Sequence, residues 1–242
     1  MRFIITLLLF SVLAFSADSP PIVNLSVAGT NDPAQFVKTI NIAVILTLMV
    51  LAPTLILMVT SFTRIIIVFS LLKQAMGLQQ TPPAQVIVSL ALVLTMFIME
   101  PYAKKSWEDG VKPYMDQKIG YELAWERGIR PFKEFMIKNT RESDLALFYR
   151  IKKEPNPKNI DDVPLTLLMP SFIVSELRTA FEIGFLIFLP FLVIDIIVAS
   201  ILMSLGMMML PPVMISLPVK IIFFIVIDGW QLIIGNIAQS FK

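Results

Sequence analysis

Five ionisable side chains stand within otherwise apolar stretches of the sequence: Arg64, Glu182, Asp195, Lys220 and Asp228. Charged groups at membrane depth are energetically unfavourable, and they often mark a path for ions or protons. Two bases against three acids also permit pairing, in which opposite charges fix the register of helices between subunits. The residue types alone leave both interpretations open.

Asp195 and Asp228 also allow a third interpretation, because two neighbouring carboxylates can share a proton as they do in an aspartyl protease. Neither local sequence, VIDI around Asp195 or IDGW around Asp228, is a catalytic motif. The chain has no Cys and no His, which excludes thiolate nucleophiles, imidazole acid–base chemistry and metal sites built on those ligands. We therefore predict no catalytic residue, no metal site and no cofactor.

Methionine is concentrated in one short segment of the chain. Five of the 14 methionines fall between positions 203 and 214, and Met207, Met208 and Met209 are consecutive. One interpretation is that these flexible side chains fill gaps in a core. The other is a soft apolar collar on a loop that Gly206 and Pro211-Pro212 set between two helices. In a symmetric ring such a collar would close a pore yet yield to a passing chain, and it would block ions by dewetting.

The composition is that of a polytopic membrane protein. Hydrophobic residues make up 56% of the 242 residues and charged residues only 16%, against about 25% in soluble domains. A formal charge of +2 gives no reason to expect nucleic-acid binding. We predict an all-α fold with two apolar helical hairpins flanking a small helical periplasmic region.

The sequence divides into five predicted parts. They are a signal peptide (residues 1–16), an exposed lead-in (17–38), a first apolar hairpin (39–99), a periplasmic helical region (100–178) and a second apolar hairpin with the methionine-rich loop (179–242). The first part has a basic start, an apolar run too short to span a bilayer comfortably, and Ala14-Phe15-Ser16 as a cleavage site. Arg64 and Lys73 are expected near the tip of the first hairpin, which indicates a cytoplasmic tip.

The central region is expected to hold short helices: one over 120–127 that Gly128 closes, and another that begins at Pro131. Two apolar stripes at helical spacing follow, one through Phe135 and one through Phe148. The spacing favours internal packing but leaves a subunit contact open. Glu176 is most simply a polar residue near the membrane boundary.

The last apolar segment, residues 221–239, is a poor lipid span. Its apolar residues contribute about −5 kcal/mol to insertion, and Asp228 offsets about 2.5–3.5 kcal/mol of that. Gln231, Asn236 and Gln239 reduce it further. Such a segment is expected to lie against protein or water, as in one subunit of a larger assembly.

Several stretches of this sequence resemble the FliP family of flagellar type III export membrane proteins. They are residues 60–69 (TSFTRIIIVF), 135–136 with 140–148 (TRESDLALF), 175–181 (SELRTAF), 202–209 (LMSLGMMM) with Pro211-Pro212, and 228–232 (DGWQL). The resemblance covers roughly residues 40–242.

The resemblance implies a core subunit of the flagellar protein export gate in the bacterial inner membrane, at the flagellar basal body. It implies a ring of about five copies that is completed by FliQ- and FliR-like subunits, beside FlhA and FlhB, and that passes unfolded export substrates. The family's methionine gasket corresponds to Met207, Met208 and Met209, and its subunit contacts correspond to Phe135, Phe148 and Glu176. A proton-coupled transporter or ion channel that uses the intramembrane Asp residues is the alternative.

Overall fold

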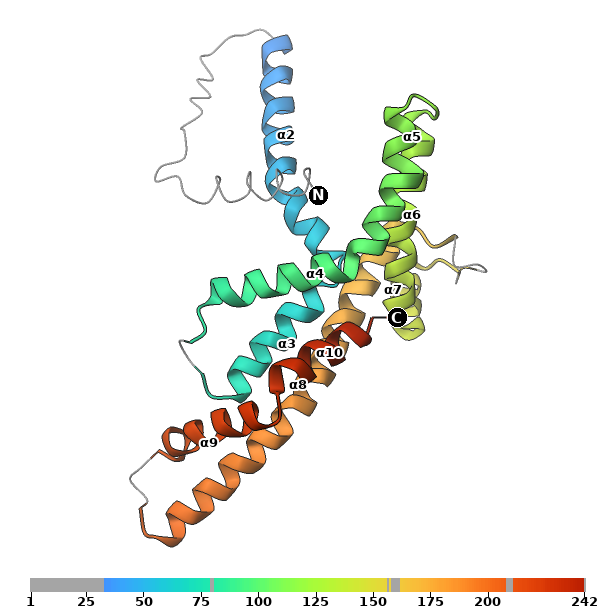
Figure 1. Cartoon of the computed structure of the whole chain (residues 1–242). Helices are drawn as coiled ribbons and strands as arrows, with labels where there is room; N and C mark the ends of the chain where they lie inside the picture. The colour runs from blue at the N-terminus through green and yellow to red at the C-terminus, as the bar shows by residue number, and fades with distance from the viewer. Residues whose placement is uncertain (1–32, 79–80, 156, 158–161, 208–210, 242) are drawn as a thin grey trace. The chain divides into compact units, whose positions relative to one another are not determined.

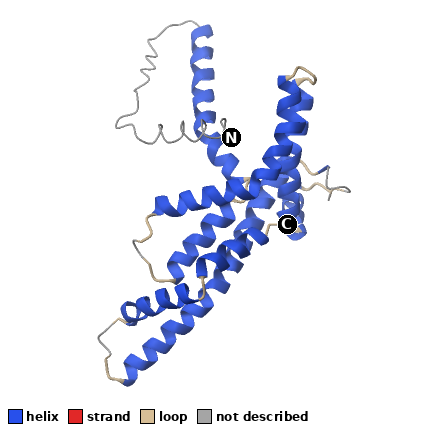
Figure 2. Cartoon of the chain, viewed as in Figure 1, coloured by secondary structure: helices blue, strands red, loops and turns tan. Residues whose placement is uncertain are grey.

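Helices are the only regular elements among the residues that the computed structural model describes, namely 33–78, 81–155, 157, 162–207 and 211–241 (Figures 1 and 2). The chain divides into two compact units at Ala52/Pro53. The predicted signal peptide and most of the predicted lead-in lie outside the described residues.

The first unit contains most of α2 (Pro33–Met58). Pro33 suits the first position of a helix, because its ring fixes φ near the helical value and its missing N–H would have no partner there. No Asp, Glu, Lys or Arg occurs from Thr39 to Met58, and the large side chains along this stretch are apolar and mostly exposed. A helix that is apolar on all sides over 20 residues is typical of a membrane span.

After the last residues of α2, the second unit continues with two helices that pack against each other, α3 (Phe62–Ala75) and α4 (Ala84–Ser106). Helix α4 continues through a π-helical turn, η1 (Trp107–Val111), into the short α5 (Lys112–Met115). Helix α6 (Tyr121–Asn139) then runs back beside η1 and α4 (Figure 1).

Helix α8 (Leu165–Ser204) is the longest helix of the second unit, and α3, α6, α7 (Glu142–Lys152) and α9 (Pro212–Val226) all pack on it. It runs unbroken through Pro170 and Pro190. The last helix, α10 (Gly229–Gln239), follows α9 after a bend of 65°. In the part of the chain that the structure describes, three helical stretches are long and apolar enough to cross a membrane, or four if α9 and α10 together form one bent span.

One core cluster forms where the two predicted apolar stripes meet α8. Phe135 and Met136 of α6 and Tyr149 of α7 pack on Leu168 and Phe172 of α8. Phe148 is half-buried against the same cluster. Burial raises the pKa of the Tyr149 hydroxyl, since the charged form would be poorly solvated there.

Three sequence-based expectations were wrong in detail. The central region does not break at Gly128 or Pro131, because α6 runs through both as one helix. The last apolar segment, treated above as one helix, forms two, because Asp228 takes a left-handed conformation (φ 50°) between α9 and α10. Arg64 is not beside Lys73 at a hairpin tip, because it lies in the first turn of α3 and is only 2% exposed.

The contact between η1 and α6 depends on two glycines. A Cβ atom placed on Gly110 would lie 2.7 Å from the backbone of Gly128 and 2.8 Å from the carbonyl oxygen of Ala124. These are main-chain atoms, which cannot rotate away as a side-chain tip can. The close approach of the two helices therefore requires glycine at position 110.

We predict that Gly110→Ala separates η1 from α6 and destabilises the fold by about 1–3 kcal/mol, the usual effect of overpacking. Thermal unfolding of the detergent-solubilised chain measures this as a lower melting temperature. Gly235→Ala on α10 is the matched control, because a Cβ added there would meet nothing within 4 Å beyond its own helical turn. Equal melting temperatures for the two variants would contradict the proposed close contact.

Buried charges and the methionine loop as a candidate functional site

Arg64 and Glu176 form an ion pair inside the second unit. Arg64 Nε donates to Glu176 Oε2 at 2.8 Å, and Nη2 donates to the other carboxylate oxygen. The Arg64 side chain is 3% exposed and that of Glu176 is 0% exposed. The pair thus joins the first turn of α3 to α8 through two parallel hydrogen bonds.

The remaining donors of Arg64 reach two further segments. Nη1 donates to the carbonyl oxygen and the hydroxyl of Ser240, at 3.0 and 2.8 Å, and Nη2 donates to Asn139 Oδ1 at 3.4 Å. The guanidinium carbon lies 3.8 Å from the centre of the Phe241 ring, in cation–π geometry. All five N–H donors of the guanidinium therefore have acceptors, which is the condition under which a charge tolerates burial.

A second ion pair joins α9 to α8. Lys220 is 3% exposed, and its Nζ donates to Asp195 Oδ2 at 2.6 Å and to the Ala75 carbonyl oxygen at 3.1 Å. Ser216 donates to the other carboxylate oxygen of Asp195 at 2.6 Å. These bonds attach α9 to both α8 and the end of α3.

A third polar group connects α7 with α8. Ser175 donates to the buried Asp144 at 2.7 Å and accepts from the backbone N–H of Arg141 at 3.1 Å. Glu182 accepts from Arg141 at 2.6 Å and from Arg178 at 3.2 Å. The hydrogen bond to Glu182 is the main reason that the pKa of Arg141 is raised above its ordinary value.

Four of the five charged residues singled out from the sequence therefore make ion pairs: Arg64, Glu182, Asp195 and Lys220. Asp228 differs from them. It is exposed, and within the described part of the chain no ion pair involves it. Its backbone carbonyl accepts from Leu232 in the first turn of α10 at 3.1 Å.

The described part of the methionine loop has a defined start and end. Gly206 takes φ +74°, its N–H bonds to the Met203 carbonyl, and the Met207 N–H bonds to the Leu202 carbonyl. This is a Schellman motif, which ends α8. Pro212 then begins α9, as the sequence predicts from Pro211-Pro212. Met207 is 45% exposed, while Met208 and Met209 lie outside the described residues.

Two of the three expected subunit-contact residues have no exposed surface in this chain. Phe135 is 0% exposed, with its ring centre 5.0 Å from that of Tyr102 and 5.9 Å from that of Phe241. Glu176 is engaged by Arg64. Sequence reasoning did not find the roles of Asn139, Ser240 and Phe241, because no local pattern marks a residue that contacts a distant charge.

These features define the class: an all-helical membrane protein whose apolar helices are joined by buried, hydrogen-bonded charges. Comparison with known proteins then gives the family. The profile of the FliP family matches residues 45–237, and the chain belongs to this family.

Curated relatives match this chain over most of their own length. The flagellar biosynthetic protein FliP of Bacillus subtilis is 47% identical over 217 residues, which is 90% of this chain and 98% of the relative. The FliP of Caulobacter vibrioides is 48% identical over 85% of this chain and 77% of its own length. The FliP of Pectobacterium carotovorum is 46% identical over 97% and 90%.

We predict that Arg64→Gln or Glu176→Gln alone destabilises the chain by about 3–5 kcal/mol, because each leaves an unpaired charge buried. The double variant is expected to lose less than the sum of the two. Chemical denaturation in detergent measures both quantities. Arg130→Gln is the control, since its ion pair with Glu134 is exposed and such pairs contribute only about 0–1 kcal/mol. Additive losses would show that the two residues do not act as one unit.

Proposed function

We propose that this chain is a core subunit of the flagellar type III protein export gate, and that it forms a ring-shaped entry channel for unfolded export substrates. The observation that carries the proposal is membership of the FliP family over residues 45–237. Its curated relatives are named flagellar biosynthetic proteins. On this proposal the chain binds and passes polypeptide and catalyses no reaction.

The surface of the second unit supports assembly into an oligomer. Large apolar side chains on α8 and α9, such as Phe185, Leu186 and Val226, are 63–75% exposed. So much apolar surface is unfavourable in water and needs lipid or protein to cover it. We propose about five copies of the chain in the ring, with FliQ- and FliR-like subunits completing it and FlhA and FlhB beside it.

We propose Met207, Met208 and Met209 as the gate of this channel. The Schellman motif that the Met207 N–H closes and the proline start of α9 fix the two ends of the loop. The Lys220–Asp195 bond holds α9 against α8. A flexible apolar collar on a fixed base would admit a passing chain and exclude water and ions at rest.

Phe135, Phe148 and Glu176 would support subunit contact mainly by holding α6, α7 and α3, respectively, in place on α8. Phe135 anchors α6 in the core, and Glu176 binds Arg64. Loss of either would displace surfaces that a neighbouring copy meets. On this proposal, buried residues affect assembly although they do not touch a neighbouring subunit.

We also propose the location and topology that the sequence indicates: the bacterial inner membrane at the flagellar basal body, with residues 100–178 on the periplasmic side. A cleaved signal peptide over residues 1–16 would place the following segment outside the membrane. The charge of Arg64 no longer supports a cytoplasmic hairpin tip, because Glu176 neutralises it. Lys73 remains the basic residue that indicates a cytoplasmic tip.

The competing function is a proton-coupled transporter or ion channel that uses Asp195 and Asp228. Asp195 accepts hydrogen bonds from both Lys220 and Ser216, which favours a structural role. Asp228 is exposed and is the better candidate for a residue on an ion path.

The first experiment is the native mass of the detergent-purified chain, alone and co-expressed with its FliQ- and FliR-like neighbours. We expect a discrete oligomer of about five copies that captures the unlike partners, because the exposed apolar helices need cover. A stable monomer or dimer that captures neither partner would overturn the ring.

The second experiment separates the gate from the transporter. Replacing Met207, Met208 and Met209 with Ala is expected to make the membrane leak ions, because a smaller collar stays wet. Ion flux in cells expressing the variant measures the leak, and Met214→Ala on α9 is the control. We expect Asp228→Asn to retain motility, because that carboxylate is exposed and, among the described residues, joins no helices through an ion pair. If Asp228→Asn abolishes proton flux while the methionine changes have no effect, the gate proposal fails.

A further inference from the structure

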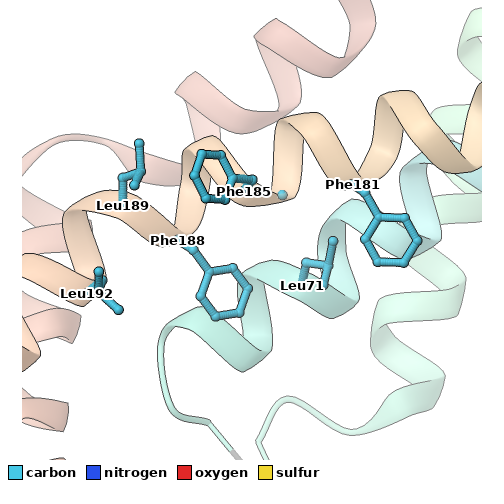
Figure 3. A pocket seen from close by; sticks show the side chains of 7 residues that line it. Leu71, Phe181, Phe185, Phe188, Leu189 and Leu192 are labelled. Carbon is cyan, nitrogen blue, oxygen red and sulfur yellow. The ribbon is translucent and has the colours of Figure 1, made fainter.

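Helix α3 is attached to α8 at two places along its length. The ion pair between Arg64 and Glu176 attaches its first turn. In its second half, Leu71 lies beside α8, where it and the rings of Phe181 and Phe188 line one apolar groove (Figure 3). A Cβ atom placed on Gly184 would lie 2.2 Å from Leu71 Cδ1, so the absence of a side chain at 184 allows α3 to approach α8 closely.

The chain turns sharply at the end of α3. Gly77 takes φ +77°, its N–H donates to the Gln74 carbonyl at 3.0 Å, and the Leu78 N–H donates to the Lys73 carbonyl at 3.1 Å. This is a second Schellman motif, like the one that ends α8. Glycine adopts this left-handed conformation without the strain that other residues would carry.

The turn at Gly77 lies against the beginning of α9. A Cβ atom placed on Gly77 would lie 3.6 Å from Leu217 Cδ1 and 3.9 Å from Val213 Cγ1. These are ordinary contact distances, so a methyl group would fit there and a larger side chain directed the same way would meet α9.

Further contacts join the same end of α3 to α9. Lys220 Nζ donates to the Ala75 carbonyl at 3.1 Å, a favourable position for a cation because the carbonyl end of a helix is partly negative. Met76 and Phe224 belong to one buried cluster. One face of α9 therefore lies along the end of α3, since the contacting positions follow helical spacing: 213, 217, 220 and 224.

The contact at Gly77 is close to the methionine loop. Val213 lies in the first turn of α9, directly after the prolines at which the loop ends. The hydrogen bond from Ser216 to Asp195, which attaches α9 to α8, lies one turn further from the loop. The turn at Gly77 thus supports the part of α9 that carries the end of the loop.

We propose that Gly77 is a positioning residue for the gate, because the turn that it forms sets where the first turn of α9 stands. The inference rests on the gate function proposed above for Met207, Met208 and Met209. Since α3 is attached to α8, a bulky side chain at 77 moves α9 rather than α3. A displaced α9 carries its end of the collar with it, and a collar that no longer closes becomes wet and passes ions.

Two variants at the same position test the proposal. Gly77→Ala and Gly77→Phe carry a similar unfavourable backbone conformation, but only the Phe ring needs space that α9 occupies. We expect ion leak through resting cells to rise several-fold for Gly77→Phe and to stay near that of the unchanged chain for Gly77→Ala. Leu217→Ala added to Gly77→Phe makes room for the ring and is expected to lower the leak again. Similar melting temperatures and native masses for the two Gly77 variants show that the fold is kept.

A disulfide tests the same contact without a bulky side chain. The chain has no Cys, so Gly77→Cys with Val213→Cys gives one defined pair. A disulfide needs Cβ atoms about 3.5–4.5 Å apart, which the contact at Gly77 brings within reach. We expect the bond to form on mild oxidation, as mass spectrometry of the joined peptides shows. Oxidised cells are expected to remain tight to ions and to secrete export substrates as well as cells treated with a reductant.

Three results would overturn the proposal. Equal leak for Gly77→Phe and Gly77→Ala at similar melting temperatures would mean that the turn does not position the gate. A Cys pair that does not join would mean that the contact is not made, and a disulfide that stops secretion until it is reduced would mean that the contact opens during export. If the variant with Ala at 207, 208 and 209 is also tight to ions, the gate function itself fails, and this inference fails with it.

Discussion

The ion pair between Arg64 and Glu176 is the interaction on which the second unit depends. It joins α3 to α8 and, through the other donors of Arg64, holds Asn139, Ser240 and Phe241 around one guanidinium. Isolated charges at this depth would cost several kcal/mol each. Each of the five N–H donors of Arg64 meets an acceptor, so only one arrangement of the surrounding groups satisfies the buried guanidinium. The helices are therefore fixed relative to one another by the directions of these hydrogen bonds as well as by packing.

The same constraint explains why so much apolar surface can stay exposed. Hydrogen-bonded polar side chains at three positions along α8, namely Ser175, Glu176 and Asp195, hold neighbouring helices in place. The outward faces are then free to be apolar, and lipid or other subunits can cover them. This arrangement suits a subunit of a membrane assembly better than a protein that folds around one large core of its own.

Buried, hydrogen-bonded charge also holds the helices beside the methionine loop, near the other end of α8. Lys220 attaches α9 to Asp195 and to the end of α3, so the loop between α8 and α9 begins and ends on a braced helix pair. The gate function proposed for this loop would need such a rigid base, because a passing chain would otherwise displace the whole hairpin. The bend at Asp228 then turns α10 toward the Arg64 cluster, where Ser240 and Phe241 complete it.

The helical class, the apolar helices and the ends of the methionine loop could all be predicted from the sequence, because composition, helical periodicity, glycine and proline act locally. The family could be predicted as well, since its motifs are contiguous. The meeting of Arg64 with Glu176, 112 residues away, became visible only in the folded chain. The burial of Phe135 agrees with its helical spacing, which favoured internal packing, and not with the direct subunit contact that the resemblance implied. The continuation of α6 through Pro131 is also a result that only the folded chain shows. Proline disfavours a helix interior, and the packing of α6 on α4, η1 and α8 compensates for it. Contacts between distant residues depend on how helices pack, and no local pattern encodes that.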